Sequence, residues 1–244
     1  MSQASRPALV FVHMFAGSGS SWDRVTPLLA ADHHCLAPDL RGFGAALPPE
    51  PGATLVDWAD DLAAITEPLD RFVLVGHSMG GKIATLLASR RPRGLAAVIL
   101  VAPSPPSPEP IPDRTAMLAG FGDRDTAAAT ARQICDGADD PSIMEQLVTD
   151  SVRTSYAAWE WWVERGSRDD ICDQAGRIAV PTTVLGGHDD TTIPSDLLLR
   201  EVVGRIPGST FTTVPGSRHM IPIDAPETVA LLIGQVVLKL SIEP

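Results

Sequence analysis

The sequence has few cysteines and no long apolar run. Its three cysteines, Cys35, Cys135 and Cys172, lie far apart without a C-x-x-C pair, which excludes a disulfide framework and indicates a reducing compartment. No apolar stretch reaches the roughly 18 residues of a membrane span. The apolar run at residues 8–12 is also too short for a signal-peptide core. We therefore expect a cytoplasmic protein that does not engage membranes.

Positive charge is also scarce. Nineteen Lys and Arg residues face 30 Asp and Glu residues, a net charge of −11. This balance argues against an electrostatic nucleic-acid binder. Hydrophobic residues make up 44% of the 244 residues and charged residues 20%. These values predict a globular protein with a sizeable core, built as one large domain or one domain with an insertion.

Short apolar runs alternate with segments of helical periodicity. The runs are apolar on both faces, as in buried parallel strands, and cover residues 8–13, 34–38, 72–76, 95–101, 182–185 and 210–214. Helical patterns cover residues 22–31, 55–67, 80–91, 196–203 and 226–240. The alternation predicts an α/β fold with a mostly parallel sheet of about six strands flanked by helices.

One long segment interrupts this alternation. About 80 residues separate the fourth and fifth strands, too many for a simple connection. A proline-rich stretch at residues 103–112 precedes helical patterns at 113–119, 126–135, 142–151 and 155–165. We predict that residues 103–176 form an inserted helical cap (lid) over the carboxyl edge of the sheet, where open α/β folds bind ligands. Residues 1–102 and 177–244 would form the core domain.

A G-x-S-x-G motif, Gly76-His77-Ser78-Met79-Gly80, joins the third predicted strand to a helix. The motif alone is weak evidence, but a strand before it and a helix after it are the context that a nucleophile elbow needs. The glycines permit close approach of strand and helix. The serine hydroxyl would then lie at a helix N-terminus that favours an oxyanion. The alternative is a serine in an ordinary turn.

A serine nucleophile needs a base and an orienting carboxylate. His219 lies in the loop between the last strand and the last helix. Asp189 and Asp190 follow the fifth strand. Both loops open on the same sheet edge as Ser78, in the chain order Ser, Asp, His expected for this architecture.

Five motifs together resemble the α/β-hydrolase superfamily, in order and over nearly the whole chain. They are His13-Met14-Phe15-Ala16-Gly17-Ser18, similar to an oxyanion loop; Asp39-Leu40-Arg41-Gly42-Phe43-Gly44; the elbow at Ser78; Gly187, Asp190 and Pro194; and Gly216, His219 and Pro222. The resemblance implies Ser78 as nucleophile, His219 as general base and acid, and Asp190 as its orienter. It also implies an oxyanion hole formed by the Phe15 and Met79 N–H groups, with no cofactor and no metal.

Three features depart from the family pattern. Met14 stands where the family typically has glycine, and a Cβ there limits positive φ and so affects where the Phe15 N–H points. Ala45 follows Gly44 where many relatives have serine. The chain begins almost at the first strand, so we expect the N-terminal hairpin to be missing and six parallel strands rather than eight mixed ones.

Other residues have competing interpretations. Asp189 competes with Asp190 as the acid, although the spacing to Gly187 and Pro194 favours Asp190. Some relatives place the acid after the preceding strand, where Glu109 or Asp113 would serve. A metal site at His188, Asp189 and Asp190 is disfavoured because three consecutive side chains rarely converge on one ion.

Three further polar residues are assigned structural roles. We expect His13 to brace the oxyanion loop and His77 to pack or hydrogen-bond inside the elbow. Lys82 could steer acidic substrates, but we favour a solvated or salt-bridged lysine.

Aromatic residues gather in the predicted cap. At helical spacing Tyr156, Trp159 and Trp162 share a face. This face either packs the cap onto the core or lines an apolar pocket, and both roles are compatible. We predict pocket residues Met14, Met117, Phe121, Tyr156, Trp159 and Trp162.

We expect a cofactor-independent serine hydrolase for carboxylic esters, lactones or thioesters with an apolar acyl or aromatic part. Alternatives on the same triad are a C–C bond hydrolase, a cofactor-free perhydrolase or haloperoxidase, and a lyase. A receptor-like relative that binds a ligand with little turnover belongs to another class. The expected partner is a small ester-like molecule, with no nucleic acid or membrane, and the chain would be a monomer or homodimer.

Overall fold

The computed structural model describes residues 6–242 of the chain. Within this range the six predicted strands form one parallel sheet, in the order β2-β1-β3-β4-β5-β6. Their bounds are β1 (Ala8–Val12), β2 (Cys35–Leu36), β3 (Phe72–His77), β4 (Leu95–Val101), β5 (Thr182–Gly187) and β6 (Thr210–Val214). The predicted α/β class and sheet are thus confirmed.

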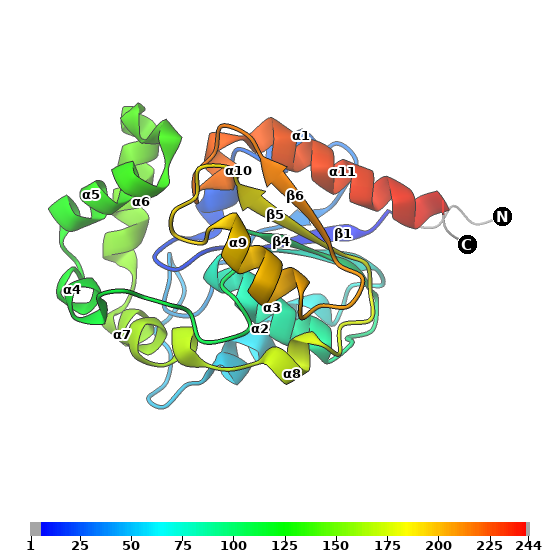
Figure 1. The fold of residues 1–244 in the computed structure, drawn as a ribbon, viewed down its shortest axis with the longest axis horizontal. Coiled ribbons are helices and arrows are strands. Elements are labelled where there is room, and N and C mark those ends of the chain that lie inside the picture. Colours follow the sequence, from blue (N-terminus) through cyan, green and yellow to red (C-terminus); the bar gives the residue numbers. More distant parts are fainter. Residues whose placement is uncertain (1–5, 243–244) are drawn as a thin grey trace.

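Helices cover both faces of the sheet (Figure 1). One face packs against α1 (Thr26–Leu29) and α11 (Pro226–Ile242), and the other against α2 (Leu55–Thr66), α3 (Met79–Ser89) and α9 (Ser195–Leu198). Alternate strand residues supply the two cores, because successive side chains point to opposite faces. Along β1, Leu9 and Phe11 enter the first core and Val10 and Val12 the second.

The long segment between β4 and β5 is helical. It contains α4 (Arg114–Ala119), α5 (Arg124–Ile134), η2 (Asp136–Asp139), α6 (Pro141–Arg153), α7 (Tyr156–Glu164), η3 (Gly166–Arg168) and α8 (Cys172–Ala175). Helices α4 to α7 lie beyond the carboxyl ends of the strands, at the left of Figure 1. An apolar cluster joins α5 and α6 to Met14, Met220 and Ile223 of the core. The helical insertion is as expected, and its separation into a second domain stays a prediction.

Some helix bounds differ from the sequence-based expectation. The helix predicted at residues 22–31 is a 3₁₀ turn, η1 (Gly19–Trp22), followed by α1. Pro27 lies in the first turn of α1, where a residue without N–H is tolerated, so the helix starts later than predicted. Helix α9 continues as a π-helical turn, η4 (Leu199–Val203), and α10 (Ile221–Asp224) follows His219.

In residues 6–242 no helix is long and apolar enough to cross a membrane.

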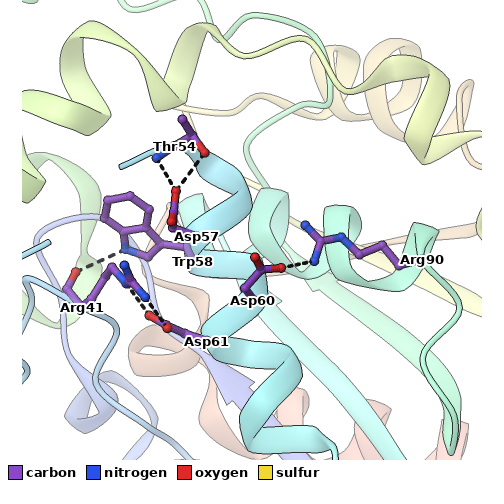
Figure 2. Close-up of polar contacts among 7 residues, drawn as sticks. All are labelled: Arg41, Thr54, Asp57, Trp58, Asp60, Asp61 and Arg90. Atoms are coloured by element: carbon purple, nitrogen blue, oxygen red, sulfur yellow. Dashed lines mark hydrogen bonds and ion pairs between the residues drawn. The ribbon is translucent and has the colours of Figure 1, made fainter. Parts of the chain in front are cut away.

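The turn from Asp39 to Gly44 ties the core to the helical insertion. Arg41 forms an ion pair with Asp61 of α2, and its carbonyl accepts the indole N–H of Trp58 (Figure 2). Trp58 in turn stacks on Trp161 of α7, with ring centroids 3.6 Å apart. Gly42 has φ +84°, and a Cβ there would lie 2.4 Å from the Ala158 Cβ, so this approach of turn and helix requires glycine.

Helix α2 is itself fixed at several points. Thr54 and Asp57 form a capping box at its N-terminus, and Asp60 pairs with Arg90 after α3 (Figure 2). The reciprocal cap satisfies two backbone donors that the first turn would otherwise leave free. The surface that supports the Trp58–Trp161 stack is therefore held in place.

Candidate active site

Ser78 occupies a sharp turn between β3 and α3. Its φ is +52° and ψ is −121°, a region that non-glycine residues rarely adopt and that clusters at functional sites. A Cβ on Gly76 would meet the Gly80 carbonyl oxygen at 2.7 Å, and one on Gly80 would meet the His13 carbonyl oxygen at 2.4 Å. The two glycines therefore allow the strained turn to pack, and Ser78 lies at the N-terminus of α3.

Ser78, His219 and Asp190 are hydrogen-bonded in series. The Ser78 hydroxyl lies 3.0 Å from the His219 Nε2, and the His219 Nδ1 lies 2.8 Å from the Asp190 Oδ2. All three side chains are buried. With the proton on Nδ1, the ring donates to Asp190 and its Nε2 accepts the serine proton. This is the geometry of a nucleophile, base and orienting carboxylate.

Asp190 is held by backbone donors as well as by the histidine. Its Oδ1 accepts the N–H groups of Thr192 at 2.8 Å and Ile193 at 3.0 Å. Burial raises the pKa of Asp190, but hydrogen bonds from His219 and these two N–H groups outweigh it and hold the pKa below its usual value. The carboxylate is thus ionised and oriented toward the histidine ring.

The competing assignments around Asp190 find no such geometry. His188 and Asp189 are exposed, whereas Asp190 is buried. Among the described residues no group of three or more His, Cys, Asp or Glu side chains is arranged to hold a metal ion. Asp113 caps α4 by accepting the Ala116 N–H at 2.8 Å. Glu109 accepts a hydrogen bond from the Ser104 hydroxyl. The His219 Nδ1 pairs with Asp190 and not with Glu109.

Two buried histidines fix the surrounding loops. The His13 Nδ1–H donates to the Met14 carbonyl at 2.7 Å, and its Nε2 accepts the Leu40 N–H at 3.0 Å. The His77 Nε2–H donates to the His219 carbonyl at 2.9 Å. Burial is the main cause that lowers the pKa of His13 to about 4 and that of His77 to about 3. Both rings are therefore neutral and structural.

The loop that precedes η1 carries Phe15, which lines the same cavity as Ser78. In the part of the chain that the structure describes, the N–H groups of Phe15 and Met79 have no acceptor. The positive φ that Met14 would have resisted falls instead on Ala16, at +57°. The Met14 carbonyl closes the turn by accepting the Gly17 N–H at 3.3 Å. Both groups predicted for the oxyanion hole are thus free to donate.

A cavity of about 460 Å³ opens beside Ser78 and His219. Four of the predicted pocket residues line it: Met14, Met117, Trp159 and Trp162. Helix α5 adds a wall that the sequence analysis missed, formed by Ala127, Ala131 and Ile134. Their spacing of i, i+4, i+7 was the available signal. The cavity is mostly apolar and lies between the helical insertion and the Ser78 turn.

Tyr156 and Phe121 were wrongly assigned to this pocket. Tyr156 is 52% exposed at the start of α7, and its hydroxyl donates to Glu160. Phe121 packs edge-on against Tyr156 and Trp159 and does not line the cavity. Of the three aromatic residues predicted to share a face of α7, Trp159 and Trp162 line the cavity and Tyr156 does not.

Lys82 also differs from its expected role. Its side chain is fully buried, and its ammonium group donates to the Ser107 carbonyl at 3.2 Å and the Ser167 carbonyl at 3.4 Å. Burial lowers its pKa to about 8. Within residues 6–242 Lys82 is therefore neither solvated nor salt-bridged, and it joins the proline-rich stretch to η3.

Comparisons with known proteins define the class. The alpha/beta hydrolase family profile matches residues 9–231, so the chain belongs to this family and is a hydrolase. A putative non-heme chloroperoxidase of Synechocystis sp. is 28% identical over 235 residues, covering 87% of this chain and 84% of the relative.

Solved structures agree on the fold. An esterase from Exiguobacterium antarcticum has a TM-score of 0.87 at 18% identity, covering 96% of this chain and 92% of that structure. An enol-lactonase from Burkholderia xenovorans has a TM-score of 0.85 at 20% identity, covering 98% and 94%. At such low identity these likenesses show the shared fold alone.

Proposed function

We propose that this protein is a cofactor-independent serine hydrolase that cleaves carboxylic esters, lactones or thioesters through an acyl-enzyme on Ser78. The observation that carries the proposal is the hydrogen-bonded series of Ser78, His219 and Asp190 beside an apolar cavity. A serine hydroxyl is a weak nucleophile unless an oriented base accepts its proton. Here His219 is the base, and Asp190 orients it.

Acylation uses the geometry directly. The Ser78 Oγ attacks the carbonyl carbon of the substrate while the His219 Nε2 accepts the hydroxyl proton. The resulting oxyanion accepts hydrogen bonds from the Phe15 and Met79 N–H groups, each such donor being worth about 3 kcal/mol of transition-state stabilisation. The C–O or C–S bond then breaks, and the protonated His219 gives its proton to the leaving alkoxide or thiolate. The imidazolium is stabilised meanwhile by Asp190.

Deacylation repeats these steps with water. The His219 Nε2 accepts a proton from water as its oxygen attacks the acyl carbon. The tetrahedral intermediate then collapses to a carboxylic acid, and the proton returns to the Ser78 Oγ. Residues 103–176 act as a cap that shields this site, since their helices supply most of the apolar cavity wall.

The cavity supports an apolar acyl or aromatic group as the part of the substrate that is bound. Trp159, Trp162 and Met14 present flat or flexible apolar surface beside Ser78, as small-molecule sites commonly do. Solved structures of the same fold include an esterase and an enol-lactonase.

A second candidate is supported by the relatives called non-heme chloroperoxidases. On the same site hydrogen peroxide would replace water in deacylation, so that the acyl group leaves as a peracid, which then oxidises halide. We favour three other functions less. They are C–C bond hydrolysis, a lyase reaction and ligand binding without turnover.

The test is hydrolysis of p-nitrophenyl esters from C2 to C12 by wild type and by Ser78→Ala. Ester hydrolysis by wild type that Ser78→Ala reduces by at least about 10³-fold supports the proposal. A folded wild type that is inactive on every ester overturns it. Halide oxidation that depends on both peroxide and acetate, with weak ester hydrolysis, would favour the second candidate.

A further inference from the structure

Glu109 lines the same cavity as Ser78 and His219, but its carboxyl group takes no part in their hydrogen-bonded series. It lies in the proline-rich stretch after β4. The Ser104 N–H donates to the Ser78 carbonyl at 3.0 Å, and the Ser104 hydroxyl donates to the Glu109 Oε2. Glu109 is therefore joined to the nucleophile turn through a single residue.

The backbone of Glu109 is held from both sides. Its N–H donates to the Ser167 carbonyl at 2.7 Å, and its carbonyl accepts from the Arg114 guanidinium at 3.1 Å. The buried ammonium of Lys82 bridges the neighbouring Ser107 and Ser167 carbonyls. Four hydrogen bonds thus hold residues 107–109, which carry this carboxyl group.

The second carboxyl oxygen of Glu109 is available to a ligand. Within residues 6–242 the Oε1 has no hydrogen-bond partner. The other carboxylate on the cavity wall, Asp113, is exposed and caps α4. The described residues that line the cavity include no lysine or arginine. The two cations that act on Glu109, Lys82 and Arg114, do not line the cavity, so an anionic group entering it finds no cation on the wall.

From this arrangement we infer that Glu109 is a specificity residue, which accepts a hydrogen bond from a cationic or donor group of the substrate and disfavours substrates that carry a carboxylate. The inference rests on the proposed function, because it names the substrate class of the same site. Opposite charges a few ångströms apart attract strongly where water is partly excluded, and like charges repel to a similar extent.

A binding measurement tests this inference independently of turnover. The probes are octylammonium, 1-octanol and octanoate, which share one apolar chain and differ in the charge of the head group. Their Kd values are measured by calorimetry on Ser78→Ala and on the double variants Ser78→Ala/Glu109→Gln and Ser78→Ala/Glu164→Gln. Glu164 is on α7, does not line the cavity and pairs with Arg168, so its variant matches the change in net charge.

We expect Ser78→Ala to bind the ammonium probe most tightly and octanoate most weakly. Glu109→Gln should weaken ammonium binding about tenfold and tighten octanoate binding by a similar factor, with 1-octanol within about twofold. Glu164→Gln should change none of the three by more than about twofold. Equal shifts in the two charge variants, or no preference for the cation in Ser78→Ala, would overturn the inference. An inactive wild type with the expected Kd order would overturn the proposed function alone.

Discussion

The Nε2–H of His77 donates to the backbone carbonyl of His219 at 2.9 Å, so the residue before the nucleophile holds the loop that carries the base. The centroids of the two imidazole rings lie 5.2 Å apart. His77 is fully buried, and its low pKa keeps the ring neutral. One side of the Ser78–His219 hydrogen bond is therefore positioned by the elbow itself.

This relationship predicts that His77→Leu lowers kcat by about tenfold with little change in KM. The substitution leaves a buried carbonyl without its donor, at a cost of about 1–3 kcal/mol, and lets the His219 loop move. Steady-state kinetics with circular dichroism as a folding check would measure it. His77→Gln supplies an amide donor and should recover part of kcat. A Leu variant with unchanged kcat, or a Gln variant no better than Leu, would contradict the positioning role.

Asp190 and Asp189 form a matched pair of adjacent carboxylates. Asp190→Asn should lower kcat by about 10³–10⁴-fold, because the amide cannot stabilise the imidazolium and can favour the wrong tautomer. Asp189→Asn, at an exposed position, should change kcat less than about threefold. A larger loss in Asp189→Asn than in Asp190→Asn would reverse the assignment of the acid.

The cavity wall predicts the preferred acyl length. Trp159→Ala removes a large side chain that lines the cavity, so the optimum in the p-nitrophenyl ester series should move to longer chains. Tyr156→Ala serves as the control, because Tyr156 lies on the same helix outside the cavity. Its optimum should match that of wild type. A shift of the optimum in the Tyr156 variant alone would show that a different surface holds the acyl group.

The buried neutral histidines predict acid-sensitive folding. Unfolded histidine takes up a proton near pH 6.5, whereas His13 in the folded chain stays neutral until its pKa of about 4. The contribution of His13 to the free energy of unfolding is therefore full above pH 6.5 and is lost as the pH falls toward 4. From pH 7 to pH 5, His13 should account for about 2 kcal/mol of the loss in the free energy of unfolding.

Urea unfolding of wild type and His13→Gln at the two pH values measures this contribution. The drop should be smaller in His13→Gln by about 2 kcal/mol. A His188→Gln variant, changed at an exposed histidine, should show the same drop as wild type. An undiminished drop in His13→Gln would mean that His13 does not govern the acid response.

Local patterns predicted the nucleophile turn and the histidine loop because both are set by neighbours in sequence. Ser78 needs Gly76 and Gly80 around it, and His219 follows a strand whose end is fixed by the sheet. The interior of the insertion was less predictable. Lys82 looked like a surface residue because the carbonyls that it contacts lie 25 and 85 residues away, and no local pattern encodes them.

The same distance problem explains the errors in the pocket. Helical spacing grouped Tyr156 with Trp159 and Trp162, but the rotation of α7 is set by the Trp58–Trp161 stack and by the approach of Gly42 to Ala158. These contacts join parts of the chain more than 100 residues apart and turn Tyr156 outward. Helical periodicity predicted which side chains share a face of α7. Tertiary packing determines which of them reach the cavity.

The central claim is that Ser78 is the nucleophile, and covalent trapping tests it most directly. Diethyl p-nitrophenyl phosphate transfers its diethylphosphoryl group to an activated serine and releases p-nitrophenolate. We expect wild type to release one equivalent of p-nitrophenolate per chain and mass spectrometry to find the added group on the peptide that contains Ser78. Ser78→Ala should release none, and His219→Ala should react far more slowly. Labelling of a different residue, or no labelling of a folded wild type, would contradict the claim.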